Sequence, residues 1–186
     1  MKNTEALLGF RLFALPKGAL PGCWCLDTIK TMWYAQFGED EKLRSLLGES
    51  DPGFYIDIGA WEPTLYSVTK HFYERGWRGI NIEPVPYYHE RLAAERPRDV
   101  NLQVAISHEA GEKELTYIEE SGLSSFDEEN ARRGSDGRIA HRICVKMMTL
   151  ADLCDLYVPA EQTIDFQKID VEGWERQVLV GWNWRK

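Results

Sequence analysis

Two acids and a glycine stand near the ends of two apolar segments, at a spacing that could hold a nucleoside cofactor. Asp57 lies in the segment FYIDI, Gly59 follows it, and Glu83 ends the segment GINIE, 26 residues after Asp57. A dinucleotide needs further glycines beside its pyrophosphate, but Trp61 and Glu62 occupy that part of the turn here. S-adenosylmethionine has no phosphate, its sulfonium is cationic, and its ribose hydroxyls suit a carboxylate such as Glu83. The pattern therefore favours S-adenosylmethionine over NAD.

A second group of charges lies in KIDVEG, where Lys168, Asp170 and Glu172 fall on one side of the chain while it stays extended. They either reach solvent where the strand ends or serve chemistry, because burying three charges without partners is costly. A sugar or alcohol hydroxyl needs a general base, or a divalent cation that lowers its pKa, before it accepts a methyl group. Asp170 and Glu172 suit either role, since Mg²⁺ prefers oxygen ligands. Lys168 could orient a carboxylate or the substrate.

The elements that must position these residues alternate between strand and helix, which predicts an α/β fold. We expect an open, mainly parallel sheet with helices on both faces and the ligand at the carboxyl ends of the strands. In the expected helix 64–76, Leu65, Val68 and Phe72 have helical spacing. The other expected elements are helices at 34–48, 87–97, 150–157 and from 174, strands at 54–58, 79–84, 101–107 and 163–173, antiparallel additions at 113–119 and 142–150, and a loop or lid at 119–141.

Length and charge exclude some classes of protein. The 186 residues suffice for one domain, and we expect an N-terminal leader at 1–33 followed by a cofactor-binding domain at 34–186. The net charge of −8 argues against a nucleic-acid partner. No apolar run approaches the roughly 20 residues of a membrane helix, and the N-terminus lacks a secretory pattern. We therefore expect a cytoplasmic protein without a membrane span.

Seven motifs, in order, resemble those of the FkbM-family S-adenosylmethionine-dependent methyltransferases over about residues 33–182. They are YAQFGED (34–40), FYIDIGAWEP (54–63), FYERGWRGINIEPVP (72–86), RPRDVNLQVAIS (96–107), GLSSF (122–126), VKMMTLADL (145–153) and FQKIDVEGWERQVLVG (166–181). The resemblance implies a Rossmann-like class I methyltransferase fold and methylation of a hydroxyl. The acceptor it implies is a saccharide or glycan precursor, or a polyketide-type product, with a place in polysaccharide biosynthesis.

The resemblance also implies roles for individual positions. Lys168, Asp170 and Glu172 are the expected catalytic residues, the last two within the family's D-x-E-G signature. Whether a metal takes part stays open. The positions matched to cofactor binding are the turn residues Asp57, Gly59 and Ala60, the ribose acid Glu83 with Pro84, the adenine segment Ala105, Ile106 and Ser107, and Gln36 and Asp40 of the upstream helix.

The chain departs from the family pattern in two places. Trp61 and Glu62 stand where smaller, amide or imidazole side chains are common, so we expect a reshaped pocket, with Trp61 in the core or walling the site. The sequence ends at Lys186, which predicts a sheet without its last C-terminal strands and an open edge that could pair with a second copy. The leading hypothesis is an O-methyltransferase. The alternatives are a degenerate methyltransferase-fold binding module without catalytic activity and, third, a dehydrogenase with an unusual loop.

Overall fold

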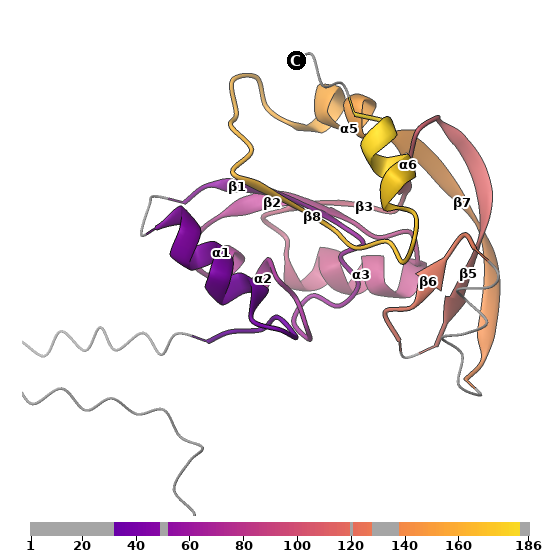
Figure 1. The fold of residues 1–186 in the computed structure, drawn as a ribbon, viewed down its shortest axis with the longest axis horizontal. Coiled ribbons are helices and arrows are strands. Elements are labelled where there is room, and N and C mark those ends of the chain that lie inside the picture. The colour runs from indigo at the N-terminus through magenta and orange to yellow at the C-terminus, as the bar shows by residue number, and fades with distance from the viewer. Residues whose placement is uncertain (1–31, 49–51, 120, 128–137, 183–186) are drawn as a thin grey trace, which may run out of the picture. The chain divides into compact units, whose positions relative to one another are not determined.

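A parallel sheet of four strands forms the centre of the part of the chain that the structure describes (Figure 1). The structure is a computed structural model, and it describes residues 32–48, 52–119, 121–127 and 138–182. The strands are β1 (Phe54–Ile58), β2 (Arg78–Ile82), β3 (Val100–Leu102) and β8 (Phe166–Ile169). Their order is β3-β2-β1-β8, and each neighbouring pair is parallel. The chain runs outward from β1 to β3 and returns on the other side as β8, an arrangement that favours a ligand crevice at the carboxyl ends of β1 and β8.

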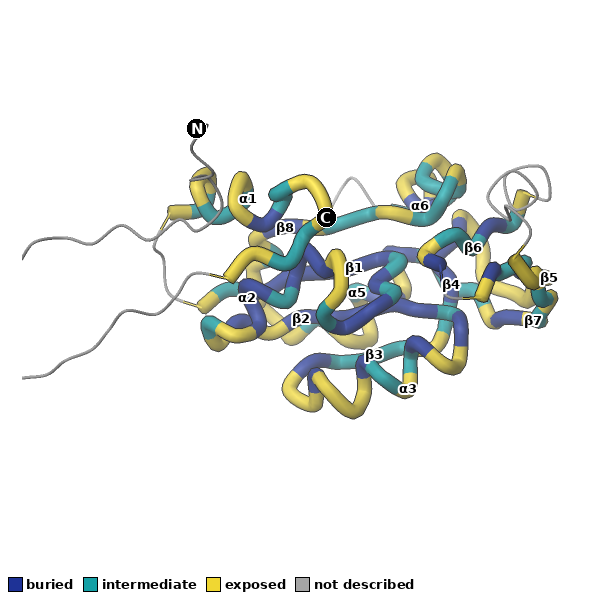
Figure 2. The backbone as a smooth tube through the Cα atoms, turned by 90° about the horizontal axis from the view of Figure 1, so that it is seen from below, coloured by how far each residue is buried: buried dark blue, intermediate teal, exposed yellow. Residues whose placement is uncertain are grey.

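Helices cover both faces of this sheet, which explains why all five residues of β1 are buried. On one face, Ile56 packs in a core with α5 (Leu150–Tyr157) and α6 (Glu175–Val180). On the other face, Tyr55 packs with Phe72. That face carries α1 (Glu39–Leu47), α2 (Lys70–Glu74) and α3 (Pro86–Glu95). Figure 2 shows β1 and β2 as the buried centre between these layers. The predicted α/β arrangement, with a parallel sheet and helices on both faces, is confirmed.

A second sheet, of order β4-β7-β5-β6, lies beyond the end of the first. Its strands are β4 (Ala105–Ser107), β5 (Gly111–Ile118), β6 (Ser124–Ser125) and β7 (Ala140–Thr149). The antiparallel pairing of β5 with β7 confirms the predicted antiparallel additions. The single strand predicted at 101–107 is wrong: β3 pairs with β2 in the first sheet, whereas β4 pairs with β7 in the second. The chain changes partners at Gln103–Val104, so one apolar segment serves two sheets.

The helix predicted at 64–76 is much shorter, because α2 begins only at Lys70. Tyr66 has a φ of 56° and forms a β-bridge with Ala35. The Pro63 carbonyl and the Ser67 hydroxyl accept hydrogen bonds from the buried Arg96. The polar groups of this segment are therefore satisfied outside a helix. Leu65, predicted to face the core at helical spacing, is 52% exposed.

Two predicted segments lie mainly outside the described residues, namely the N-terminal leader 1–33 and the middle of the loop 119–141. Of the leader, the structure describes Met32 and Trp33, which contact His71 on α2. Among the described residues, no helix is both long enough and apolar enough to cross a membrane.

Candidate functional site

The turn after β1 approaches the end of β8 so closely that only glycine fits between them. Gly59 has a φ of 78°, and a Cβ built on it would lie 2.0 Å from the backbone oxygen of Asp170. The amides of Gly59 and Ala60 both donate to the carbonyl of Ile82, at 3.0 and 3.1 Å. Gly59, which the sequence singled out, therefore lies where the ends of β1, β2 and β8 meet.

Behind this turn, a buried polar chain orients Asp57, which is 1% exposed. Its Oδ2 accepts a hydrogen bond of 2.7 Å from the hydroxyl of Thr69. Thr69 in turn accepts one of 2.6 Å from Arg96, which is fully buried. Arg96 also donates to Pro63 and Ser67, so its guanidinium holds the whole segment that follows the turn. Sequence reasoning missed Thr69 and Arg96, although Arg96 opens the matched motif RPRDVNLQVAIS.

Lys168 ties the turn to the fourth strand. Its Nζ lies 3.3 Å from Asp57 Oδ1 and 3.6 Å from Asp170 Oδ2, and it donates a hydrogen bond to the carbonyl of Gly59. Burial acts to lower the pKa of Lys168, but the carboxylates of Asp57 and Asp170 outweigh it and raise that pKa above its usual value. Lys168 is therefore a charged positioning group at this site and an unsuitable base.

Glu83 fastens the turn to the end of β2. It is 5% exposed, and its two carboxylate oxygens accept hydrogen bonds of 2.9 Å from the amides of Trp61 and Val85. Burial raises the pKa of Glu83 to about 7, although both hydrogen bonds and the charge of Lys168 act to lower it. Glu83 therefore titrates near neutral pH. Its oxygens can each accept a further hydrogen bond on the side that faces the site.

Asp170 and Glu172 reach the site by a route that differs from the predicted one. The strand β8 ends at Ile169, and Glu172 and Gly173 have φ values of 50° and 95°, so regular alternation stops before Glu172. The carbonyl of Glu172 accepts a hydrogen bond of 3.1 Å from the buried Ser125. Burial raises the pKa of Glu172, with the charges of Asp170 and Glu175 adding to the effect. The side chain of Asp170 is 64% exposed, whereas Glu172 is partly buried.

Two hollows that share part of their lining surround these groups. The narrow cleft is mainly apolar, and Ile82, Glu83, Pro84, Ala105, Ile106 and Trp174 are among its lining residues. The wide recess is more polar, has a volume of about 430 Å³, and is lined by residues that include Gln36, Ala60, Tyr66, Arg138 and Lys168. Five residues line both hollows: Gly59, Trp61, Gly122, Asp170 and Glu172. The two acids that were predicted to be catalytic, Asp170 and Glu172, therefore lie in the lining that the two hollows share.

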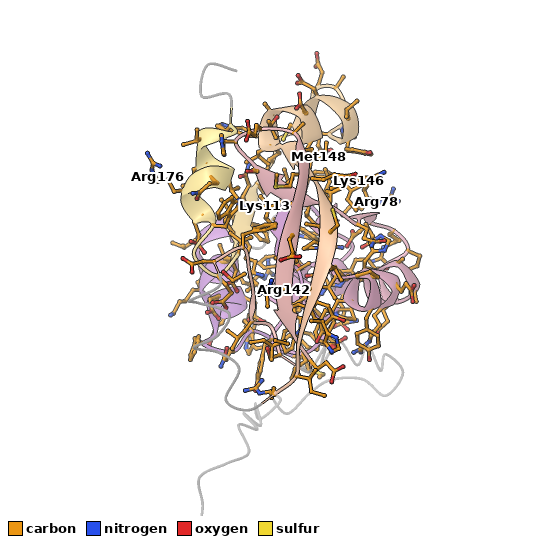
Figure 3. The ribbon with its side chains drawn as sticks, turned by 90° about the vertical axis from the view of Figure 1, so that its right-hand side faces the viewer. Arg78, Lys113, Arg142, Lys146, Met148 and Arg176 are labelled. Atoms are coloured by element: carbon orange, nitrogen blue, oxygen red, sulfur yellow. The ribbon has the colours of Figure 1, made fainter. Side chains whose placement is uncertain are left out.

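Two further aromatic side chains, Phe126 and Trp174, line the narrow cleft, and the sequence analysis did not place either of them at the site. Trp174 and Phe126 lie with ring centroids 5.0 Å apart, and both line the cleft. Lys113 of β5 lies beside α6, with its Nζ 5.4 Å from the ring of Trp174 (Figure 3). Phe126 belongs to the matched motif GLSSF, so the signal for it was present in the sequence.

Three predicted cofactor residues line neither hollow: Asp57, which is buried behind the turn, Asp40 and Ser107. Asp40 is fully buried, and its carboxylate accepts hydrogen bonds from the backbone amides of Tyr34, Ala35 and Glu41. It therefore holds the segment before α1, whereas Gln36 of that segment does line the wide recess. Ser107 is buried, with its hydroxyl 3.3 Å from His108 Nδ1.

The acids of the site do not form a metal centre with the neighbours that the structure describes. Within the described ranges, no three side chains among histidines, cysteines, aspartates and glutamates are grouped so that they could hold an ion. The proposal that Asp170 and Glu172 bind Mg²⁺ therefore has no support in this geometry.

The fold and site define an α/β protein with an acidic turn, a strand-end carboxylate and an apolar cleft. These features suit a cofactor without phosphate groups better than one that carries a pyrophosphate. A family model, described as the methyltransferase FkbM domain, matches residues 57–186. The chain belongs to the FkbM methyltransferase family. Comparisons with curated proteins and with solved structures gave no match.

Proposed function

We propose that this protein is an S-adenosylmethionine-dependent O-methyltransferase with a Rossmann-like class I fold. It methylates a hydroxyl of a saccharide or glycan precursor. The observation that carries the proposal is the common wall of the two hollows, in which Gly59, Asp170 and Glu172 lie. A cofactor in the narrow cleft and an acceptor in the wide recess would meet at these carboxylates.

The residue types of the narrow cleft suit the parts of S-adenosylmethionine, and the cleft, whose volume is about 50 Å³, would have to widen to admit the adenosine. Ile82 and Ile106 offer apolar walls to an adenine, and Glu83 offers acceptors to ribose hydroxyls. The described residues that line the cleft include three acids and no lysine or arginine, which suits a cationic sulfonium and opposes a phosphate. Gln36, which lines the wide recess beside the turn, is available to the methionine part.

In the proposed reaction, the bound cofactor supplies a methyl group. The acceptor oxygen forms a bond to the methyl carbon as the carbon–sulfur bond breaks, and the electron pair of that bond stays on sulfur. A carboxylate takes the proton of the hydroxyl. Glu172 suits this task better than Asp170, because its raised pKa brings it closer to neutral pH. Asp170 pairs with Lys168, which in turn contacts Asp57 and the carbonyl of Gly59, so Asp170 acts on the position of the turn.

Calorimetric titration with S-adenosylhomocysteine, with NADH as the control, tests the cofactor. We expect micromolar binding of S-adenosylhomocysteine and none of NADH. Incubation with S-adenosylmethionine carrying a labelled methyl group and a panel of neutral glycans tests the reaction, and mass spectrometry identifies the methylated oxygen. Binding without transfer to any acceptor would favour the alternative of a binding module. Preferential binding of NADH would overturn the proposal.

Cytoplasmic location and assembly into a homo-oligomer stay predictions from the sequence.

A further inference from the structure

A third hollow, the aromatic recess, lies against the turn and takes no part in cofactor binding as proposed. Trp61, Glu62, Val85, Tyr87, Tyr88 and Tyr117 are among its lining residues, and its volume is about 550 Å³. Trp61 lines the aromatic recess as well as the narrow cleft and the wide recess. The aromatic recess therefore shares one lining residue with each of the hollows that Asp170 and Glu172 line.

The conformation of Trp61 is fixed from several sides. Its φ is 50°, and its amide donates to Glu83. Its ring stacks on Tyr66, with centroids 6.2 Å apart, and meets Tyr88 edge-on at 5.9 Å. A Cβ on Gly122 would lie 3.4 Å from the indole, so the ring also closes on the segment that follows β5. Trp61 therefore has a fixed conformation in the lining of all three hollows.

The chemistry of the aromatic recess selects among ligands. Four aromatic side chains give it broad apolar faces, on which the C–H face of a pyranose ring can bury area. Two carboxylates stand among them. Glu62 pairs with Arg91 and Glu119 pairs with His141, and each carboxylate retains oxygen lone pairs for a sugar hydroxyl.

Charge excludes anionic ligands. No lysine or arginine is among the described residues that line the recess, whereas two glutamates are. A phosphate or uronate would meet these carboxylates, and Arg91 and His141 beside them are already paired with Glu62 and Glu119. A purely apolar chain would cover these carboxylates and remove their remaining oxygen lone pairs from water. A neutral sugar satisfies both the aromatic faces and the carboxylates.

We infer that the aromatic recess is a second saccharide subsite, which holds the neutral sugar unit next to the one that is methylated. This inference rests on the proposed saccharide acceptor and deepens it. The acceptor is then at least a disaccharide without an acidic group at that unit. Trp61 lines both this subsite and the wide recess, where the unit at Asp170 and Glu172 lies.

The test is binding of neutral oligosaccharides of one to four units, from the malto and N-acetylchito series, to the full chain saturated with S-adenosylhomocysteine. Saturation-transfer NMR and tryptophan fluorescence provide the readouts. In at least one series we expect about tenfold tighter binding from one unit to two, since one aromatic contact of this kind is worth about that factor. Tyr87→Ala and Tyr117→Ala should each remove most of this gain.

Tyr157→Ala is the matched control, because Tyr157 is a partly exposed tyrosine on α5 that lines none of the three hollows. It should keep the gain, and all three variants should bind S-adenosylhomocysteine like the unchanged protein. The inference is overturned if no neutral saccharide binds, if the gain survives both recess variants, or if oligogalacturonate or an alkyl glycoside chain binds more tightly than the neutral series.

Failure of the proposed function and failure of the saccharide subsite give different experimental results. If S-adenosylhomocysteine does not bind the unchanged protein, the cofactor proposal fails, and the same saccharide series is measured without it. A chain-length gain that depends on Tyr87 and Tyr117 would still support the subsite. Its absence would refute the subsite independently of the cofactor.

Discussion

Lys168 Nζ lies 3.3 Å from Asp57 Oδ1, so that β8 and the turn after β1 share one buried charge pair. The side chain of Lys168 is 18% exposed and that of Asp57 is 2% exposed. Because Lys168 also donates to the Gly59 carbonyl, one ammonium group neutralises an acid and fixes the turn at the same time. Much of the order of the proposed cofactor site therefore depends on this pair.

Lys168→Met should destabilise the protein, since it leaves Asp57 charged in a buried position. We expect the free energy of unfolding to fall by at least about 2 kcal/mol, near the lower end for breaking a buried pair. Urea unfolding provides the measurement. Lys146→Met is the control, because Lys146 is exposed on β7 (Figure 3). Equal, small effects of both substitutions would mean that the pair contributes little.

Glu83 should make stability depend on pH in a defined window. Its pKa is raised from 4.5 to about 7 in the folded state. The folded protein therefore binds the proton more tightly than the unfolded chain, and this stabilising contribution is complete below about pH 4.5 and is lost as the pH rises through about 7. The shift corresponds to about 3 kcal/mol.

Glu83→Gln removes this titration, although it adds a constant cost because an amide cannot accept from both backbone N–H groups. The difference in free energy of unfolding between the unchanged protein and the variant should therefore shrink by about 3 kcal/mol as the pH rises from 4.5 to 8. A difference independent of pH would show that Glu83 titrates normally.

Thr69 offers a test of the polar chain behind Asp57. Thr69→Val keeps the shape but removes the hydroxyl that joins Asp57 to Arg96, whereas Thr69→Ser keeps the hydroxyl. We expect the valine variant to lose about 1 to 3 kcal/mol of stability, the cost of leaving a buried polar group unsatisfied. It should also bind S-adenosylhomocysteine several-fold more weakly, because Asp57 loses its orientation. The serine variant should resemble the unchanged protein in both measurements, and similar losses in both variants would contradict this role.

Gly59→Ala tests the close approach of the turn to β8. Its natural control is Gly48→Ala, because both glycines have φ near 75° but a Cβ on Gly48 would meet nothing within 4 Å. The control should cost about 1 to 2 kcal/mol, the price of a left-handed alanine. Gly59→Ala should cost clearly more and abolish S-adenosylhomocysteine binding, since the Asp170 carbonyl must move. Equal costs would show that the turn adapts freely.

Asp170 and Glu172 should affect turnover more than binding. We expect Glu172→Gln to lower kcat at least about 100-fold, the usual contribution of a general base, while the affinity for S-adenosylhomocysteine changes less than threefold. Asp170→Asn should lower kcat less, because Asp170 acts through Lys168. Activity assays on a glycan acceptor with its hydroxyl free, together with calorimetry, provide the two measurements. Unchanged turnover in both variants would remove the catalytic assignment.

Local pattern in the sequence was sufficient for the class of fold and for several parts of the site. The alternation of buried strands with amphipathic helices predicted a parallel sheet, and parallel strands bring their carboxyl ends to one edge. Gly59, Glu83, Asp170 and Glu172 therefore lie at one edge of the sheet, as expected from their positions after the strands, whereas Asp57 lies within β1 and contacts Lys168 behind the turn. Short-range rules suffice here because strand direction alone fixes which ends meet.

Only the tertiary structure decided which contacts these residues make. Arg96 lies far along the chain from Pro63 and Ser67, yet its hydrogen bonds to them replace the first turns of the predicted helix. The segment predicted as one strand at 101–107 serves two sheets, because β3 pairs with β2 and β4 pairs with β7. Trp61 became the wall common to three hollows through contacts with Tyr66, Tyr88 and Gly122. Such long-range packing depends on the shape of the whole assembly, which residue types and local spacing do not encode.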